Sequence, residues 1–134
     1  MASRTRVRPG RVLLIDDETV FLRMLQRALD EDHYVEAYSH AQEALAAVER
    51  ERFDVILCDI NMPQMDGPTF LAQVELRSPE DAKRVVFMTG NRLAPQTADF
   101  LERIPNACLD KPFELEDLLA LVDRRVRTPT GTAG

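Results

Sequence analysis

The sequence predicts an α/β fold in which five parallel strands form one sheet with helices on both faces. Two observations lead to this prediction. Short, wholly apolar runs at 12–15, 55–58 and 85–88 are typical of strands buried on both faces. Stretches with apolar residues at helical spacing separate such runs, so strand and helix alternate five times. This alternation implies right-handed crossovers and a doubly wound sheet, for which the strand order 2-1-3-4-5 is the usual solution.

The first two strand–helix units have one well-marked helix and one polar strand. After strand 12–15, apolar residues recur on one broad helical face: Val20, Phe21, Met24, Leu25, Ala28 and Leu29. The second strand, 35–38, is short and polar, so we expect it at an edge of the sheet. Ser39 and Gln42 resemble a capping box at the start of the helix that follows.

The remaining three units follow the same plan. The strand at 53–59 ends on Asp59, and Pro68 is suited to the first turn of the next helix, with Gly67 freeing the backbone to turn. Residues 77–81 are predicted as a polar connection and 91–95 as a loop. The fourth strand covers 85–88, and a short fifth strand covers 107–109. Their helices are marked by two sets of apolar residues: Ala98, Leu101 and Ile104; Leu115, Leu118, Leu119, Val122 and Val126.

Composition indicates a single globular domain. The 134 residues are 45% hydrophobic and 30% charged, and the net charge is −6. We expect a flexible lead-in at 1–10, the domain at 11–127, and a flexible tail or linker start at 128–134. The acidic balance disfavours nucleic acid as a direct partner, because phosphate contacts need clustered Lys and Arg. No apolar run reaches the ~20 residues of a membrane span and no signal peptide is evident, so a cytoplasmic location is expected.

The cysteines and histidines are predicted to be structural. Cys58 and Cys108 are fifty residues apart and both lie in apolar runs, which favours small hydrophobic side chains over a redox pair or zinc site. His33 and His40 flank the predicted edge strand and are expected at the surface.

Five polar residues follow four different predicted strands. Asp16 and Asp17 follow the first strand, Asp59 ends the third, Thr89 follows the fourth and Lys111 follows the fifth. The carboxyl ends of parallel strands meet at one edge of the sheet, and ligands bind there at the topological switch point. Taken singly, each residue is best explained as a cap, a loop residue or a surface charge. Those explanations give no reason for all five to lie on one edge.

The chemistry of this set fits phosphoryl transfer. Three crowded carboxylates repel one another, and Mg²⁺ relieves this while accepting a phosphate oxygen. An ammonium group and a hydroxyl group can face the oxygens of a phosphoryl group, with a carboxylate in line as nucleophile. Asp59 is the best candidate for the nucleophile, because it stands alone at the end of the central strand.

Four motifs resemble the receiver domain of two-component response regulators. They are Asp16-Asp17, Asp59-x-x-Met62-Pro63-x-Met65-Asp66-Gly67, Thr89-Gly90 and Lys111-Pro112-Phe113. The resemblance runs from about Val12 to Val126 and implies a flavodoxin-like (βα)5 fold. The loop motifs around 89–91 and 100–113 also look similar to receivers fused to hybrid sensor histidine kinases.

The resemblance implies a phosphoprotein of a phosphorelay, whose partner is a histidine kinase or phosphotransfer protein. Asp59 would accept the phosphoryl group, and Thr89 and Lys111 would respond to it. Mg²⁺ would be held by Asp17, Asp59 and the backbone carbonyl of Asn61, with Asp16 helping through water. At most slow self-phosphorylation and self-dephosphorylation are expected. Dimerisation through the last two helices is common in the family. The Lys111-Pro112 peptide bond is expected to be cis.

Two positions depart from the family pattern. Cys108 stands where receivers often carry an aromatic residue coupled to the threonine, so the signal is expected to leave through Thr89 and the loop after it. Asn106 replaces a common glycine and can adopt the left-handed conformation. Two alternatives are a silent receiver-like interaction module and an aspartyl-phosphate hydrolase. Such hydrolases commonly carry a second acid two residues after the nucleophile, where this sequence has Asn61.

Overall fold

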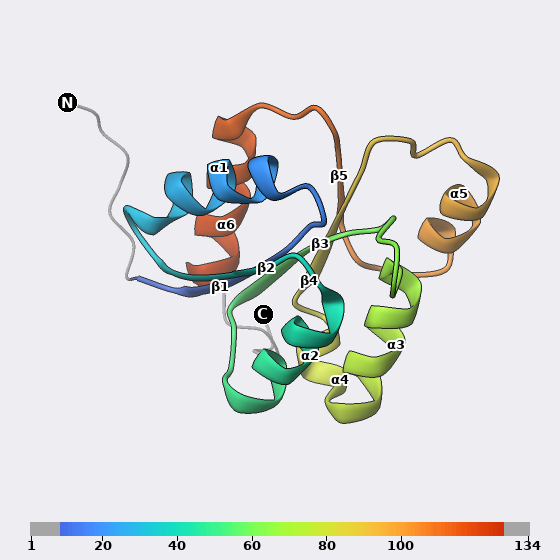
Figure 1. Ribbon diagram of the computed structural model, residues 1–134, viewed down its shortest axis with the longest axis horizontal. Helices are drawn as coiled ribbons and strands as arrows, with labels where there is room; N and C mark the ends of the chain where they lie inside the picture. Colours follow the sequence, from blue (N-terminus) through green and yellow to red (C-terminus); the bar gives the residue numbers. More distant parts are fainter. Residues whose placement is uncertain (1–8, 128–134) are drawn as a thin grey trace.

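The computed structural model describes residues 9–127, and these form one five-stranded parallel sheet (Figure 1). The strand order is β2-β1-β3-β4-β5, which confirms the predicted fold class and places the polar second strand at an edge. All four pairs of neighbouring strands are parallel. The strands are β1 (Arg11–Ile15), β2 (Tyr34–Tyr38), β3 (Val55–Asp59), β4 (Val85–Thr89) and β5 (Cys108–Asp110).

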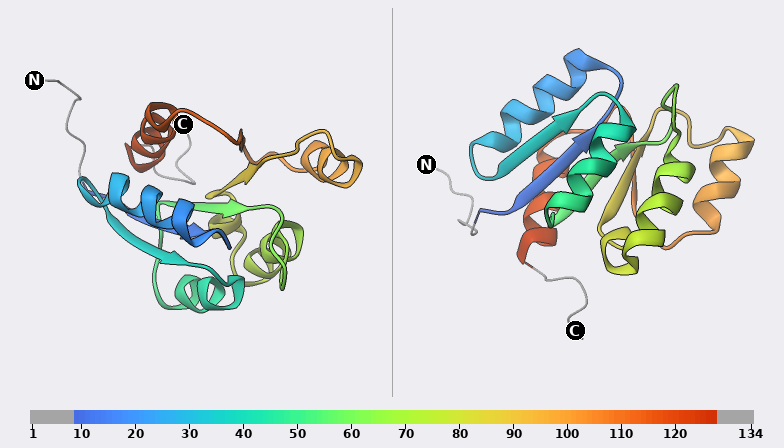
Figure 2. Two further views of the ribbon diagram at one scale, coloured as in Figure 1. Left: turned by 45° about the horizontal axis from the view of Figure 1, so that its top comes forward. Right: turned by 60° about the horizontal axis from the view of Figure 1, so that its bottom comes forward.

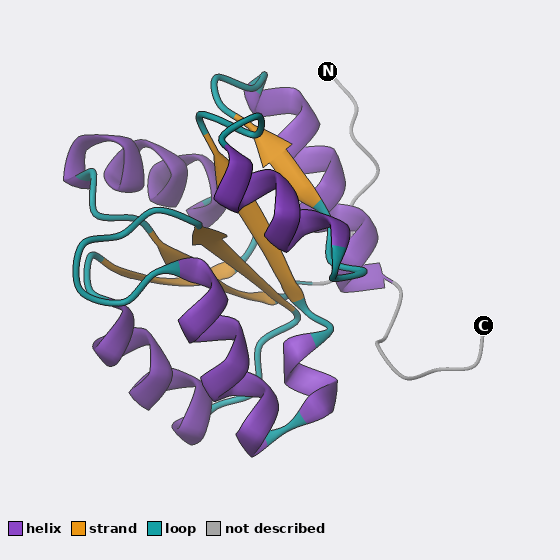
Figure 3. Ribbon diagram, turned by 90° about the vertical axis from the view of Figure 1, so that its right-hand side faces the viewer, coloured by secondary structure: helices purple, strands orange, loops and turns teal. Residues whose placement is uncertain are grey.

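Helices lie on both faces of the sheet (Figures 1 and 2). On one face are α1 (Thr19–Asp30) and α6 (Leu115–Arg127). On the other are α2 (Ala41–Arg50), α3 (Gly67–Arg77), α4 (Pro79–Ala82) and α5 (Pro95–Glu102). Figure 3 shows the sheet between the helical layers. Among residues 9–127 no helix is long and apolar enough to cross a bilayer.

The alternation of side chains along each strand produces two separate cores. In β3, Val55 and Leu57 pack with the residues of α1 and α6, whereas Ile56 and Cys58 pack with those of α2 and α3. All four of these side chains are buried. Burial on both faces explains why the central strands are continuous apolar runs, since polar side chains on either face would lose their water contacts.

The apolar face predicted for α1 is partly wrong. The buried residues of this helix are Leu22, Leu25 and Leu29, whereas Val20 is 84% exposed and Met24 is 49% exposed. The buried stripe is therefore rotated toward Leu22. The apolar residues of this helix cover more than half of its circumference, so their spacing alone does not select the stripe that meets the sheet.

Three local predictions are also corrected. His33 is buried: its Nδ1 accepts from the Gly10 N–H at 3.0 Å and its Nε2 lies 3.2 Å from Asp123 Oδ1. The capping box is absent, because His40 is the N-cap residue of α2 and makes no side-chain cap bond. The polar connection predicted at 77–81 overlaps the short helix α4, whose N-cap Ser78 accepts from the Asp81 N–H at 3.2 Å.

Asn106 acts through its side chain and not through a left-handed backbone. Within the described residues, no residue other than glycine has a positive φ. The Asn106 Nδ2 donates to the carbonyls of Ala82 and Val85, at 2.9 and 2.8 Å. These bonds tie the start of β5 to the start of β4.

Candidate functional site

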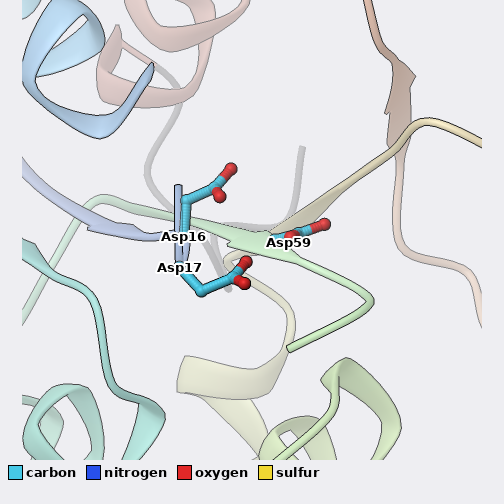
Figure 4. Close-up of side chains that lie close together, drawn as sticks. All are labelled: Asp16, Asp17 and Asp59. Carbon is cyan, nitrogen blue, oxygen red and sulfur yellow. The ribbon is translucent and has the colours of Figure 1, made fainter. Parts of the chain in front are cut away.

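The carboxyl ends of β1 and β3 bring three carboxylates together (Figure 4). Ile15 pairs with Cys58 in the sheet, so Asp16 and Asp59 leave adjacent strands at the same level. One carboxylate oxygen from each of Asp16, Asp17 and Asp59 lies within 4.8 Å of the other two. Asp16 and Asp59 are buried and Asp17 is exposed. A cluster of hard oxygen donors with one open side suits a divalent cation such as Mg²⁺.

Lys111 reaches the same cluster from the loop after β5. Its Nζ lies 2.7 Å from Asp16 Oδ2, 3.5 Å from Glu18 Oε1 and 3.8 Å from Asp59 Oδ1. Burial alone would lower the pKa of Lys111. The hydrogen bond to Asp16 and the charges of Asp59, Asp16 and Glu18 outweigh burial and raise the pKa. The side chain is therefore a permanent cation at neutral pH.

Both carboxylate oxygens of Asp16 already have partners. Oδ1 accepts from the Glu18 N–H at 2.9 Å and Oδ2 accepts from Lys111. Asp16 is fully buried, so these bonds replace its contacts with water. Asp17 and Asp59 have fewer such bonds and are therefore better placed for direct contact with a cation.

Asp59 is held in a setting that favours its protonated form. Its pKa is raised from 3.8 to about 6, first by burial and then by the charge of Asp16, with a smaller contribution from Asp17. Lys111 and the Asn61 N–H, which lies 3.4 Å from Asp59 Oδ1, act in the opposite direction. A cation placed among these carboxylates would favour ionised Asp59 and so make the carboxylate available as a nucleophile.

Thr89 ends β4 beside Asp59. Asp59 pairs with Met88 in the sheet, and the Thr89 side chain is buried. The Thr89 hydroxyl accepts from the Asn91 N–H at 3.1 Å, which links the hydroxyl group to the loop between β4 and α5. A displacement of this hydroxyl would break that bond and affect the loop directly.

Capping and packing contacts fix the conformation of the loop after Asp59. The Asp66 side chain caps α3 by accepting from the Thr69 N–H at 2.9 Å. Gly67 is needed for space rather than for a turn, since its φ lies outside the left-handed region and an added Cβ would lie 2.9 Å from Ile60 Cα. Met62 is buried and belongs to the apolar core on one face of the sheet.

Arg92 ties the loop after β4 to β5. Its Nε donates to Asp110 Oδ1 at 2.8 Å and its NH2 group donates to the Cys108 carbonyl at 2.9 Å. Burial raises the pKa of the Cys108 thiol to about 11, so this group is not a thiolate at neutral pH. The Lys111-Pro112 peptide bond is cis, as expected.

Asp16, Asp17, Asp59 and Lys111 therefore meet at one edge of the sheet, and Thr89 ends the neighbouring strand β4 at that edge. Two contributors to the site, Glu18 and Arg92, were not predicted from the sequence. Glu18 was not among the predicted site residues, and Arg92 lies in the stretch predicted as a loop. Their charges were visible, but only the fold shows that Glu18 approaches Lys111 and that Arg92 reaches β5.

The chain belongs to the response regulator receiver domain family, whose pattern matches residues 12–123. It is 30% identical to the DNA-binding transcriptional regulator NtrC of Proteus hauseri, over 87% of this chain and 24% of that protein. It is 33% identical to the response regulator MprA of Mycolicibacterium vanbaalenii, over 94% of this chain and 55% of that protein. The chain thus spans about a quarter to a half of the length of these two relatives.

Solved structures agree with the fold. The chemotaxis protein CheY4 of Vibrio cholerae matches with a TM-score of 0.75 and 31% identity, over 88% of this chain and 98% of that one. The receiver domain of the sensor histidine kinase PA1611 of Pseudomonas aeruginosa matches with a TM-score of 0.73 and 26% identity, over 90% of this chain and 99% of that one. That neighbour has a magnesium ion coordinated in its active site cleft.

The chain is therefore a signalling domain of the two-component type. The finer likeness to receivers of hybrid sensor kinases and the domain bounds at 11 and 127 stay predictions. Residues 1–8 and 128–134, which make up most of the expected lead-in and all of the expected tail, lie outside the described residues.

Proposed function

We propose that this domain accepts a phosphoryl group on Asp59 from a histidine kinase or a phosphotransfer protein. The observation that carries the proposal is the convergence of three carboxylates and the Lys111 ammonium at the ends of β1, β3 and β5. In the transfer, a carboxylate oxygen of Asp59 forms a bond to phosphorus while the phosphorus–nitrogen bond of the donor histidine breaks. The electron pair of that bond stays on the histidine nitrogen.

Mg²⁺ is the proposed cofactor. Asp17, Asp59 and the backbone carbonyl of Asn61 would hold it, and Asp16 would assist through water. Two facts support this division: both oxygens of buried Asp16 are hydrogen-bonded, and Asp17 is exposed. When bound, the ion would lower the repulsion among the carboxylates and neutralise charge on the phosphoryl oxygens.

Lys111 and Thr89 are the proposed responders. A phosphoryl group adds about −1.5 to −2 units of charge at Asp59. The Lys111 Nζ now lies 3.8 Å from Asp59 Oδ1. It would exchange part of its contact with Asp16 for a contact with the phosphoryl oxygens. The Thr89 hydroxyl would donate to a phosphoryl oxygen and release the Asn91 N–H that it now accepts from.

Arg92 offers a route for the signal that does not need an aromatic residue at position 108. The Asn91 N–H and the Arg92 guanidinium belong to the same loop, and Arg92 holds both Asp110 and the Cys108 carbonyl. A shift of the loop toward Asp59 would therefore strain or release its attachment to β5. We propose that β5 and the loop before α5 change together on phosphorylation.

The proposed role is a switch and not a turnover enzyme. Asn61, two residues after Asp59, supplies no carboxyl group for acid–base catalysis of hydrolysis, so only slow self-phosphorylation and self-dephosphorylation are proposed. No direct contact with nucleic acid or a membrane is proposed, and a cytoplasmic location and dimerisation stay predictions.

The test is phosphorylation by acetyl phosphate, followed by intact mass. The wild-type domain with Mg²⁺ should gain one phosphoryl group, whereas the Asp59→Asn variant, or wild type with a chelator, should not. A wild-type chain that stays unmodified with Mg²⁺, donor and an active histidine kinase would be a silent module. Continuous release of phosphate over many turnovers would instead indicate a hydrolase.

A further inference from the structure

The aromatic ring of Phe21 lies against the ammonium group of Lys111. The Lys111 Nζ is 4.6 Å from the centroid of this ring, within the range of a cation–π contact. Phe21 also meets Phe113 edge to face, with the ring centroids 5.8 Å apart and the planes at 64°. One ring of α1 therefore contacts both the lysine and the loop that carries it.

The ring differs in kind from the other neighbours of the ammonium group. Asp16 holds Lys111 by a hydrogen bond of 2.7 Å, and Glu18 lies 3.5 Å away. These carboxylates compete with any anion that arrives at Asp59. The face of an aromatic ring attracts a cation without fixing the direction of its N–H bonds. Phe21 can thus keep its contact while the N–H groups turn from Asp16 toward a new acceptor.

Phe21 also limits the hydration of the ammonium group. The Lys111 side chain is 16% exposed, and the ring occupies space that water would otherwise fill. A less hydrated cation interacts more strongly with an anion, because less water has to be displaced and screening is weaker. The edge contact with Phe113 restricts the loop, which lowers the number of positions available to Lys111.

We propose that Phe21 is a positioning residue for phosphoryl transfer. Its ring keeps the Lys111 ammonium group beside Asp59 and poorly hydrated, while the N–H groups remain able to change direction. This inference rests on the proposed function of the site. Phe21 forms no bond to the phosphoryl group. As the bond from Asp59 to phosphorus forms and the donor bond breaks, negative charge lies on the phosphoryl oxygens, and Lys111 meets that charge.

The experiment separates the negative face of the Phe21 ring from the volume that the side chain fills. The variants are Phe21→Tyr, Phe21→Leu, and a chain with trifluorinated phenylalanine at position 21, which keeps the ring but weakens its negative face. The readouts are the affinity for beryllofluoride, a phosphoryl mimic, at saturating Mg²⁺, and the rate of labelling by acetyl phosphate. Phe21→Tyr should match wild type, while the fluorinated and Leu variants should lose about three- to tenfold in affinity, in line with a partly buried cation–π contact.

Two further variants separate positioning from packing. Phe113→Leu removes the edge contact but leaves the ring under Lys111, so it should cost less than Phe21→Leu. Phe100→Leu removes an edge-to-face pair with Phe87, 5.3 Å between centroids, that has no contact with Lys111. It should lower stability without changing beryllofluoride affinity.

A spectroscopic signature checks the contact itself. The Lys111 Cε is bonded to the Nζ that lies 4.6 Å from the ring centroid, so its protons should resonate upfield in wild type and return to ordinary values in Phe21→Leu. If the fluorinated chain binds beryllofluoride as tightly as wild type, or Phe113→Leu and Phe21→Leu lose equally, Phe21 is only a packing residue. If wild type itself does not bind beryllofluoride with Mg²⁺, the proposed function fails before this inference is reached.

Discussion

The Lys111 ammonium nitrogen lies 2.7 Å from a carboxylate oxygen of Asp16, although 95 positions separate the two residues. Asp16 is fully buried, and Lys111 is its charged partner at the edge of the sheet. The same ammonium group stands 3.8 Å from Asp59. The Lys111 ammonium group therefore neutralises part of the negative charge that would attract a divalent cation, so the lysine and the cation compete for the same carboxylates.

Lys111→Ala should bind Mg²⁺ more tightly than wild type, by about three- to tenfold, because removing the ammonium group increases the repulsion that a cation relieves. Without Mg²⁺ the variant should lose about 2 kcal/mol or more of unfolding free energy, since a buried Asp16 is left without its counter-charge. Calorimetric titration and urea unfolding measure the two effects. Lys83→Ala, which breaks an exposed pair with Glu80, is the control and should change neither by a measurable amount. Weaker Mg²⁺ binding by Lys111→Ala would contradict this account.

The apparent affinity for Mg²⁺ should depend on pH. The pKa of Asp59 is raised to about 6, so below this pH a proton competes with the metal. Affinity should fall by up to about tenfold for each pH unit below 6, because binding then releases a proton. Titrations between pH 5 and 8 would show this slope. A flat profile would mean that Asp59 is ionised throughout or does not bind the metal.

The same shift predicts a stability change in the metal-free domain. Folding raises the pKa of Asp59 from 3.8 to about 6, so the folded chain binds this proton more readily than the unfolded chain. The resulting stabilisation is present at low pH and is lost as pH rises from 3.8 to 6. Asp59→Asn should therefore be more stable than wild type at pH 7, by about 1 kcal/mol after allowance for solvent screening, and equal to it below about pH 4.

Thr89 should be dispensable for phosphorylation but needed for the response. Thr89→Ala keeps Asp59 and its cation site, so labelling by acetyl phosphate should persist. Without the hydroxyl group, the amide signals of residues 91–92 and 108–110 should change little when beryllofluoride is added. Thr89→Ser should restore the wild-type shifts, and two-dimensional NMR of the three proteins makes the comparison. Equal responses in Thr89→Ala and wild type would mean that the signal leaves by another route.

Gly67→Ala should destabilise the loop that supports Asp59. The added Cβ would lie 2.9 Å from Ile60 Cα and 3.0 Å from Phe87 Cε1, and the backbone atom cannot move away without shifting β3. The expected loss is about 1–3 kcal/mol of unfolding free energy, together with weaker Mg²⁺ binding. Gly90→Ala is the matched control, because an added Cβ there meets nothing within 4 Å. Equal stability of the two variants would contradict the packing explanation.

The fold and the central site were predictable because both depend on local patterns and one topological rule. Buried strands such as β3 are continuous apolar runs, and the ends of parallel strands share an edge, which placed Asp16, Asp59 and Lys111 together. Side-chain contacts across elements were not predictable in this way. The burial of His33 depends on Gly10 and Asp123, and the role of Arg92 depends on its reach to β5. Neither the burial of His33 nor the contact of Arg92 with β5 can be predicted from the spacing of residues in the sequence.

Asp59, and no other carboxylate of the cluster, is the proposed acceptor of the phosphoryl group. Borohydride reduction of the acetyl phosphate-treated domain converts a phosphorylated aspartate to homoserine, and peptide mass mapping then locates it. Homoserine is expected at position 59 alone, and none is expected when Mg²⁺ is removed. Homoserine at position 16, 17 or 66, or none in the Mg²⁺-treated wild-type domain, would contradict this assignment.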